Sequence, residues 1–366
     1  MIKTILIFGA GASYDNGLDG RYKMPMSKDI FNEELDAVKA TLGLPYWQII
    51  PKRLNKIRAT VKDQFGGNVE AYIDSLKDRS LINELHRYLQ FLTLLDMKFE
   101  VSSTNYYKFM EKIIQWNLSG DLNLTGIINF NYDQLLDVTV RSELVLTDKP
   151  GKWLDIDIPY IKPHGSSDWI EFEHGHDFSI IGGDERRIRK IATSGKASGE
   201  GLLDRLTIVD LAGLDSNLYH DTTRIPIPAL MLPFMTKRIS NLCPELETAM
   251  KKAIEDADQI ILVGYGGKDS DFLECIEDRV KTNKKMFISA IGGEDAETVV
   301  GEICKRSPEV LSKVFIESEG FSKAVEKLTK DELVVKNGII THAQITVTSP
   351  TPAKTPNPIE QTASAN

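Results

Sequence analysis

Glycine, amide, carboxylate and imidazole groups occur in four short segments of this 366-residue chain, and each segment directly follows an apolar run. The segments are Gly9-Ala10-Gly11-Ala12-Ser13, Asn129-Phe130-Asn131-Tyr132-Asp133, Lys162-Pro163-His164-Gly165-Ser166 and Gly264-Tyr265-Gly266-Gly267-Lys268-Asp269. Each apolar run is typical of a buried strand, and the carboxyl ends of parallel strands line one crevice where ligands bind. The four segments therefore predict one ligand site at one edge of a sheet.

The first segment is typical of a loop that holds an anion. Gly9 and Gly11 allow close approach of the backbone, the amides of a following helix can bind phosphate, and Ser13 adds a hydroxyl. A dehydrogenase fingerprint would have a third glycine where this chain has Tyr14, and an acidic residue ending a second strand where a helix is predicted. The segment predicts nucleotide binding without hydride transfer; the alternative is a tight turn without a ligand. The predicted binding residues are Gly9, Ala10, Gly11, Ala12 and Ser13.

Asn131, Asp133 and His164 are the candidate catalytic residues. The Asn131 amide can hydrogen-bond a ribose hydroxyl and hold a water molecule, and the Asp133 carboxylate can orient that amide or stabilise developing positive charge. Histidine titrates near neutral pH, so His164 can take a proton from a hydroxyl or from water. The alternatives are an Asx turn at Asp133 that caps the next helix, and a structural role for His164. Asn129 is a weaker candidate because it lies inside the predicted strand.

The last segment predicts the far side of the same site. Gly264 and Gly266 let the backbone approach a ligand. Asp269 and Asp271 can reach a ribose hydroxyl or, as the alternative, cap the following helix. The further predicted binding residues are Gly165, Gly264, Tyr265, Gly266 and Asp269.

The elements that position these segments follow from hydrophobic periodicity. Strands alternating with helices favour right-handed crossovers and a parallel sheet. The predicted fold is α/β, a Rossmann-like parallel sheet of about six strands with a large helical insertion. Strands are expected at 4–8, from 124, and at 158–162, 229–232, 259–263 and 286–291, and helices at 133–141, 242–256, 269–281 and 294–305.

Helical spacing from Ser27, a candidate N-cap, to about Trp116 predicts an inserted module. Such a module can cover the crevice, with Tyr14 to Lys23 as its hinge, and its amphipathic helices suit self-association, so a homo-oligomer is expected. The predicted domains are a Rossmann-like domain at 1–26 and 121–330, the helical module at 27–120, a C-terminal extension at 331–345 and a disordered tail at 346–366.

The composition, 42% hydrophobic and 27% charged, is that of an ordinary globular chain. A formal net charge of −9 argues against non-specific DNA binding, although residues 186–190 form a local basic cluster, and no direct sequence-specific nucleic acid binding is expected. No apolar stretch approaches ~20 residues and no signal-peptide cleavage site follows the start, so a cytoplasmic protein without membrane contact is expected. The three dispersed cysteines, Cys243, Cys275 and Cys304, favour a reducing compartment.

The four segments, in this order, resemble the motifs of the sirtuin superfamily. The opening resembles its GAGxS phosphate loop, and Asn131-Tyr132-Asp133 its Asn-x-Asp motif. His164-Gly165 resembles the His-Gly of its catalytic loop, and Gly264-Tyr265-Gly266 its late glycine-rich motif on the adenosine side. The resemblance spans residues 1–295 and is nearest to the sirtuin-like NADase modules of bacterial anti-phage defence proteins. It implies NAD+ as the substrate, Asn131 as the catalytic amide and Asp133 as its support.

The resemblance also bears on metal and on regulation. Sirtuin deacetylases usually hold a structural zinc with two CxxC pairs, and this chain has no CxxC, so no metal is expected. The family's defence modules stay inactive until an assembly or a partner triggers them, which implies a partner such as a motor ATPase or a phage-derived protein. The interpretation is an NAD+ glycohydrolase. An NAD-dependent protein deacylase and a non-catalytic subunit that senses NAD or ADP-ribose are the alternatives.

Overall fold

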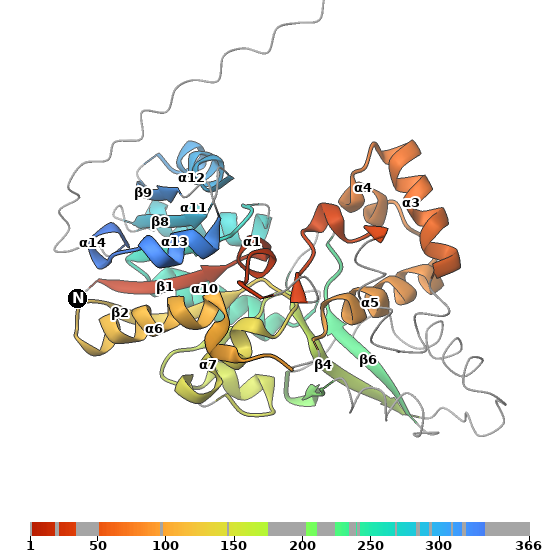
Figure 1. Cartoon of the computed structure of the whole chain (residues 1–366), viewed down its shortest axis with the longest axis horizontal. Helices are drawn as coiled ribbons and strands as arrows, with labels where there is room; N and C mark the ends of the chain where they lie inside the picture. The colour runs from red at the N-terminus through yellow and green to blue at the C-terminus, as the bar shows by residue number, and fades with distance from the viewer. Residues whose placement is uncertain are drawn as a thin grey trace, which may run out of the picture.

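The computed structural model shows an α/β sheet domain with a smaller sheet and a group of helices at one end (Figure 1). The basic cluster at 186–190 and the tail at 346–366 lie outside the described residues, as does part of the predicted hinge between Tyr14 and Lys23. The structure describes residues 2–18, 22–33, 51–95, 98–144, 146–174, 203–210, 224–233, 239, 242–267, 269–282, 286–292, 295–308, 310–316 and 320–333.

A six-stranded parallel sheet forms the centre of the described chain. In spatial order its strands are β3 (Tyr160–Ile161), β2 (Asn123–Asn129), β1 (Lys3–Phe8), β7 (Gln259–Val263), β8 (Phe287–Gly292) and β9 (Leu311–Ile316). All side chains of β7 and β8 are buried, because helices cover both faces of the sheet. The predicted α/β class with a parallel sheet is confirmed, and β1, β2, β7 and β8 begin within one residue of their predicted positions.

Two groups of helices pack on this sheet. In one group, α6 contacts α7 and α13; in the other, α10 contacts α11 and the strands β1, β2 and β3. The helices predicted at 133–141, 242–256, 269–281 and 294–305 each begin one or two residues later than expected, and α10 begins at a proline, which is favoured at the first helical position. Their bounds are α6 (Asn105–Leu118), α7 (Leu135–Leu144), α10 (Pro244–Asp256), α11 (Ser270–Thr282), α12 (Asp295–Arg306), α13 (Phe321–Lys327) and α14 (Lys330–Leu333).

A second, antiparallel sheet has the order β5-β4-β6, with β4 (Gly165–His174), β5 (Thr207–Ile208) and β6 (Arg224–Leu230). The assignment of 229–232 to the parallel sheet is therefore wrong, because this part of the chain pairs antiparallel with β4. The physical reason lies in Pro226 and Pro228. Proline lacks the N–H that a central strand needs on both sides, and β6 is an edge strand.

The helices α3 (Pro51–Phe65), α4 (Val69–Asp74) and α5 (Arg79–Thr93) lie at the same end of the molecule as the second sheet (Figure 1). Leu89 of α5 shares a buried core cluster with Ile170 of β4 and Ile227 of β6. In contrast, α6 belongs to the main core through Phe109 and Ile113, although its sequence falls in the predicted helical module. The described chain thus has two apolar clusters, and the predicted division into domains stays a prediction.

Ser27 is not the N-cap of a long helix. It begins a short 3-10 helix, Ser27–Asp29, whose N-cap is Met26. The other short elements are α1 (Ala10–Tyr14) and the 3-10 helices Val101–Ser103, Pro150–Leu154 and Leu203–Arg205.

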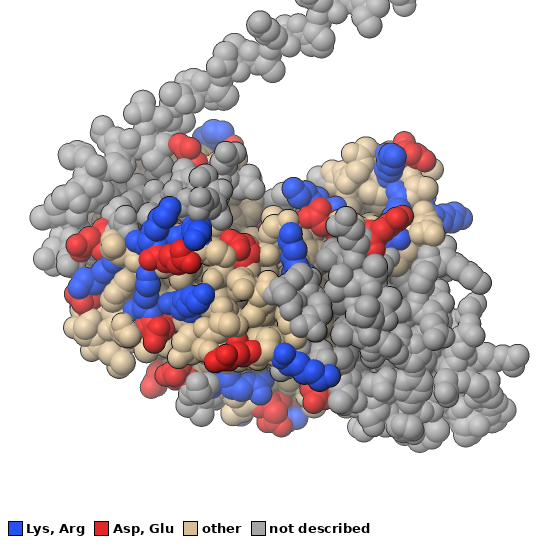
Figure 2. Space-filling model, in the orientation of Figure 1, with Lys and Arg blue, Asp and Glu red and all other residues tan. Residues whose placement is uncertain are grey.

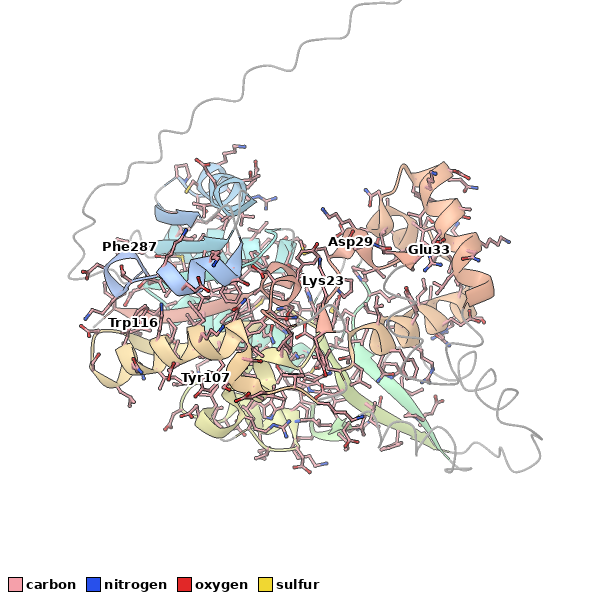
Figure 3. All side chains as sticks on the ribbon, in the orientation of Figure 1. Lys23, Asp29, Glu33, Tyr107, Trp116 and Phe287 are labelled. Atoms are coloured by element: carbon pink, nitrogen blue, oxygen red, sulfur yellow. The ribbon has the colours of Figure 1, made fainter. Side chains whose placement is uncertain are left out.

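The described surface carries charges of both signs. On the face drawn in Figure 2, Lys and Arg side chains are interspersed with Asp and Glu, as on an ordinary solvated surface. Figure 3 shows Tyr107 and Trp116 on α6, and Lys23 between the two parts of the molecule. None of the described helices combines the length and the apolar character needed to cross a membrane.

Candidate active site

The strand order reverses between β1 and β7, and the loops that follow these two strands are in contact. The Gly11 amide donates to the Gly264 carbonyl at 2.9 Å, and the Gly9 amide donates to the Val263 carbonyl at 3.0 Å. In open α/β sheets the crevice at such a reversal is where ligands bind. The first and last of the four segments therefore meet at the position where a ligand is expected.

Gly9 and Gly264 are required by the contact between these loops. Gly264 has a φ of +57°, and a Cβ there would lie 2.2 Å from the Ala12 amide nitrogen. A Cβ on Gly9 would lie 2.6 Å from Cα of Tyr265. Packing of backbone on backbone explains why both positions lack a side chain. Gly266 differs, because a Cβ there would meet nothing within 4 Å.

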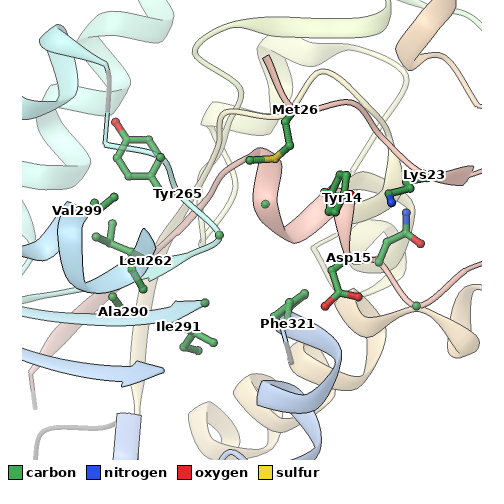
Figure 4. A pocket seen from close by; sticks show the side chains of 18 of the residues that line it. Tyr14, Asp15, Lys23, Met26, Leu262, Tyr265, Ala290, Ile291, Val299 and Phe321 are labelled. Atoms are coloured by element: carbon green, nitrogen blue, oxygen red, sulfur yellow. The ribbon is translucent and has the colours of Figure 1, made fainter. Parts of the chain in front are cut away.

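A cavity of about 820 Å³ opens beside the two loops (Figure 4). Its wall includes Gly11, Gly264 and Gly266, and its volume falls in the ~300–1,000 Å³ range of small-molecule sites. Figure 4 shows Lys23 and Tyr14 on one side of the cavity and Tyr265 on the other. The Lys23 ammonium lies 4.0 Å from the centroid of the Tyr14 ring, and it brings a positive charge to a wall that also includes Asp15, whose carboxylate bonds Ser322.

Asn131, Ser13 and Tyr106 form a closed triangle of buried polar contacts. Asn131 Nδ2 donates to Ser13 Oγ at 3.0 Å and to Tyr106 Oη at 2.9 Å, and the two hydroxyl oxygens lie 2.7 Å apart. Asn131 is only 4% exposed, and its carbonyl oxygen Oδ1 has no hydrogen-bond partner among the described residues. A buried acceptor without a partner costs free energy, so Oδ1 is the atom of this cluster that gains most from a donor on a ligand or water.

Asp133 serves the local structure at the same strand end. Its Oδ1 accepts from the Leu135 amide at 3.0 Å, which is the Asx turn that starts α7. Burial raises the pKa of the Asp133 carboxyl, while the positive charge of Lys162 and a hydrogen bond from Ser13 act in the opposite direction. Asp133 therefore both starts a helix and contacts the hydroxyl that Asn131 also contacts.

Lys162 connects three residues near the site through hydrogen bonds. Its fully buried ammonium donates to the Asp133 carbonyl at 2.7 Å, to Asp137 Oδ2 at 2.7 Å and to Ser166 Oγ at 2.8 Å. Asp137 also accepts from the Tyr160 hydroxyl. All three protons of the ammonium are used, which satisfies a charge that would otherwise be very costly to bury.

His164 lies between two aromatic rings and a carboxylate. Its ring centroid is 4.9 Å from that of Phe130 and 6.1 Å from that of Tyr132. Its Nε2 lies 2.8 Å from Oδ1 of Asp269, and its residue exposure is 4%. Asp269 also starts α11, since its carbonyl accepts from the Leu273 amide. A carboxylate beside an imidazole stabilises the charged form that arises when the ring takes a proton.

The turn that carries His164 is fixed by β6. The His164 carbonyl accepts from the Met231 amide at 2.9 Å. Gly165 has a φ of +72°, and a Cβ there would lie 2.1 Å from the Ala229 carbonyl oxygen. The absence of a side chain at Gly165 thus allows β4 and β6 to approach each other and fixes the position of His164.

Tyr265 packs against the aromatic residues next to His164. It lines the cavity, and its ring packs on Phe130 at 5.2 Å, while Phe130 in turn contacts His164. Burial raises the pKa of Tyr265, and the Asp269 carboxylate adds to that shift. Two packed rings, Tyr265 and Phe130, thus connect the wall of the cavity with His164.

The structure brings the predicted site residues into two adjoining groups. Gly11, Gly264, Tyr265 and Gly266 line the cavity. In the second group, Asn131 bonds Ser13, Asp133 is buried at the same strand end, and His164, which packs on Phe130 and Tyr132, lies beside Asp269. Gly9 caps α1, Ala10 and Ala12 lie in α1, and Gly165 begins β4, so these four residues support the site through the backbone. The sequence motifs assign no role to Lys162 or Tyr106. Lys162 stands in one of the four segments, whereas the only sequence feature of Tyr106 is its place in a helical pattern.

The described residues contain no group of three or more His, Cys, Asp or Glu side chains suited to a metal ion. The three cysteines are not paired with one another.

Comparisons with known proteins find similarity in solved structures. No protein-family model matches the chain, and no curated protein sequence matches it. The chain is similar to the structure of a Sir2 homologue mutant in complex with 2′-O-acetyl ADP ribose, with 12% identity, coverage of 88% of this chain and 90% of the other, and a TM-score of 0.39. It is also similar to a Sir2 homologue in complex with NAD, with 12% identity, 88% coverage of both chains and a TM-score of 0.33. Identities and TM-scores this low carry no argument about the chemistry of the site, which has to be argued from the residues of this chain.

Proposed function

We propose that this protein is an NAD+ glycohydrolase, which cleaves the bond between nicotinamide and C1′ of the adjoining ribose. The observation that carries the proposal is the gathering of Asn131, Asp133 and His164 after the neighbouring strands β2 and β3, where Asn131 bonds Ser13, next to Tyr14 of the cavity wall. The order and spacing of the four motifs resemble those of sirtuin-like NADases, which supports NAD+ as the nucleotide.

The reaction needs few groups from the protein. The bond from C1′ to the nicotinamide nitrogen breaks, both electrons leave with the nitrogen, and the ribose passes through an oxocarbenium-like state. A water oxygen then bonds to C1′ and gives up a proton, which His164 accepts. The products are nicotinamide, ADP-ribose and a proton. The Asp269 carboxylate, 2.8 Å from His164 Nε2, stabilises the protonated ring.

The remaining groups bind and orient the substrate. Oδ1 of Asn131 accepts a hydrogen bond from a ribose hydroxyl or from the attacking water, since it lacks a partner among the described residues. Lys23, on the wall of the cavity, attracts the pyrophosphate.

The burial of the site supports a resting state that needs activation. Asn131 and His164 are each 4% exposed, and the residues that line the cavity include Tyr265 but neither of these two. An enzyme that depletes NAD+ would harm its own cell unless controlled. We therefore propose a role in bacterial anti-phage defence, with homo-oligomerisation or a partner, such as a motor ATPase or a phage-derived protein, moving the Tyr265 loop.

The first prediction is that His164→Ala and Asn131→Ala each lower nicotinamide release by ~10²–10⁴-fold, because each removes a group that acts on the ribose or the water. Purified protein is incubated with NAD+ and an acetyl-lysine peptide, and the products are separated. Free ADP-ribose is expected. His86→Gln serves as the control, because this buried histidine lies on α5 and bonds the Ile82 carbonyl; its turnover at pH 7.5 should stay within ~3-fold of wild type.

Other products decide between the alternatives. Acetyl-ADP-ribose in place of ADP-ribose would identify a deacylase. Binding of NAD+ without consumption, with every candidate trigger present, would identify a sensor. Near-normal turnover by either alanine variant would falsify the assignment of the catalytic residues.

A further inference from the structure

We propose that Tyr106 is a positioning residue of this site. Its hydroxyl, together with that of Ser13, holds the side-chain amide of Asn131 so that the carbonyl oxygen Oδ1 faces the substrate. The inference rests on the proposed function, because it gives Oδ1 the task of accepting from the ribose or from water.

The hydrogen-bond pattern determines the orientation of the amide. The two ends of an asparagine side chain have nearly the same shape, so only their partners distinguish them. The 2.7 Å contact between the Ser13 and Tyr106 hydroxyls uses the proton of one of them, so at most one hydroxyl could donate to an oxygen of Asn131. Both hydroxyls, in contrast, offer lone pairs toward Asn131. Nδ2 is the end that can donate to them, at 3.0 and 2.9 Å, and Oδ1 must point away.

The core fixes the position of the Tyr106 hydroxyl. Tyr106 is fully buried, and its ring packs at 5.6 Å on Phe8 of β1 and at 6.0 Å on Phe321 of α13. Burial also raises the pKa of Tyr106, so the hydroxyl keeps its proton at neutral pH. The helix α6 therefore carries a fixed polar atom into the site at the end of β2.

The kinetic test compares Tyr106→Phe with Tyr107→Phe. Both variants remove one hydroxyl from adjacent positions of α6, but Tyr107 is 38% exposed on the surface. Tyr106→Phe is expected to lower kcat for nicotinamide release by ~10–100-fold with KM within ~3-fold, while Tyr107→Phe matches wild type. The double variant Tyr106→Phe/Asn131→Ala should be no slower than Asn131→Ala, because Tyr106 acts only through Asn131.

A second measurement reports the amide itself. In protein with ¹⁵N-labelled asparagine, the Asn131 side-chain NH₂ signal is assigned by its loss in Asn131→Ala. Its exchange with solvent should be slow in wild type and in Tyr107→Phe, and at least ~10-fold faster in Tyr106→Phe. If wild type releases no nicotinamide, the proposed function fails while this measurement still decides the positioning. Unchanged exchange in Tyr106→Phe, or a kcat within twofold of an active wild type, would overturn the proposal.

Discussion

At the scale of single residues, Lys162 is the most constrained charge in the described chain. Its ammonium is fully buried and bonds Asp133, Asp137 and Ser166. Lys162→Met removes these bonds and leaves the Asp137 carboxylate buried without its counter-charge. We predict a loss of ~3–5 kcal/mol in the free energy of unfolding, measured by urea denaturation at pH 7.

Lys152→Met is the matched control. Lys152 pairs with Asp155 at 3.6 Å, but the two side chains are 67% and 70% exposed. Water screens such a pair, so the expected change is within ~0.5 kcal/mol. Equal losses for the two variants would mean that burial does not set the importance of Lys162.

The residues of the site differ in how far the sequence predicts them. Asn131 and His164 stand in segments that directly follow apolar runs, and a strand end is a recognisable place for chemistry. Tyr106 and Tyr107 both stand in an amphipathic helix, and no local pattern says which of them reaches a strand end 25 residues away. Helical spacing reports that a face is buried, but the partner of one polar atom depends on the packing of the whole domain.

At the scale of elements, α5 carries a histidine that makes stability depend on pH. Burial, helped by the charge of Arg87, lowers the pKa of His86 to about 4. The unfolded chain therefore binds the proton more tightly than the folded chain. This contribution to stability is complete above pH ~6.5 and is lost as the pH falls toward 4. We predict that, between pH 7 and pH 4.5, the free energy of unfolding of wild type falls further than that of His86→Gln, by on the order of 2–3 kcal/mol.

Urea denaturation at the two pH values checks this prediction. Asp168 supplies a control in which the pH dependence has the opposite sign. Burial raises the pKa of its carboxyl to about 6, so the folded chain binds this proton more tightly than the unfolded chain. Its contribution to the free energy of unfolding is therefore largest at low pH and is lost as the pH rises through that range. Asp168→Asn should therefore lose more stability than wild type on acidification. If the free energies of unfolding of His86→Gln and wild type changed equally between the two pH values, His86 would not be a source of the pH dependence.

The elements themselves were predictable where an apolar run was long. The strands β1, β7 and β8 pack on both faces, so their sequences are continuous apolar runs that show their position. β4 begins with three polar residues after Gly165 and alternates only from Ile170, so no apolar run marks it, and it is absent from the predicted strands. The run of β6 predicts a strand but not the sheet to which it belongs, because pairing depends on distant parts of the chain.

At the scale of the whole molecule, the closed site predicts activity that depends on assembly. We expect a homo-oligomer whose contacts include residues of 27–116, and a specific activity that rises with protein concentration or on adding a trigger. Size-exclusion chromatography with light scattering, paired with nicotinamide release across concentrations, measures both. His164→Ala should assemble like wild type without turnover. A monomer with full and constant specific activity would remove this idea.

Gly266 offers a way to place a chemical reporter in the cavity. It lines the cavity, and a Cβ at this position meets no atom within 4 Å, in contrast to the glycines that hold the two loops together. Cys243 and Cys275 are buried, and burial raises the pKa of their thiols to about 11 and about 12, which makes both slow to react. Cys304 is partly exposed and is replaced by serine in the same chain, so a cysteine introduced by Gly266→Cys would take up a thiol-reactive fluorophore ahead of the two buried thiols. The emission of the label would then report, in one cuvette, when a nucleotide enters and when a trigger reshapes the loop that carries Tyr265.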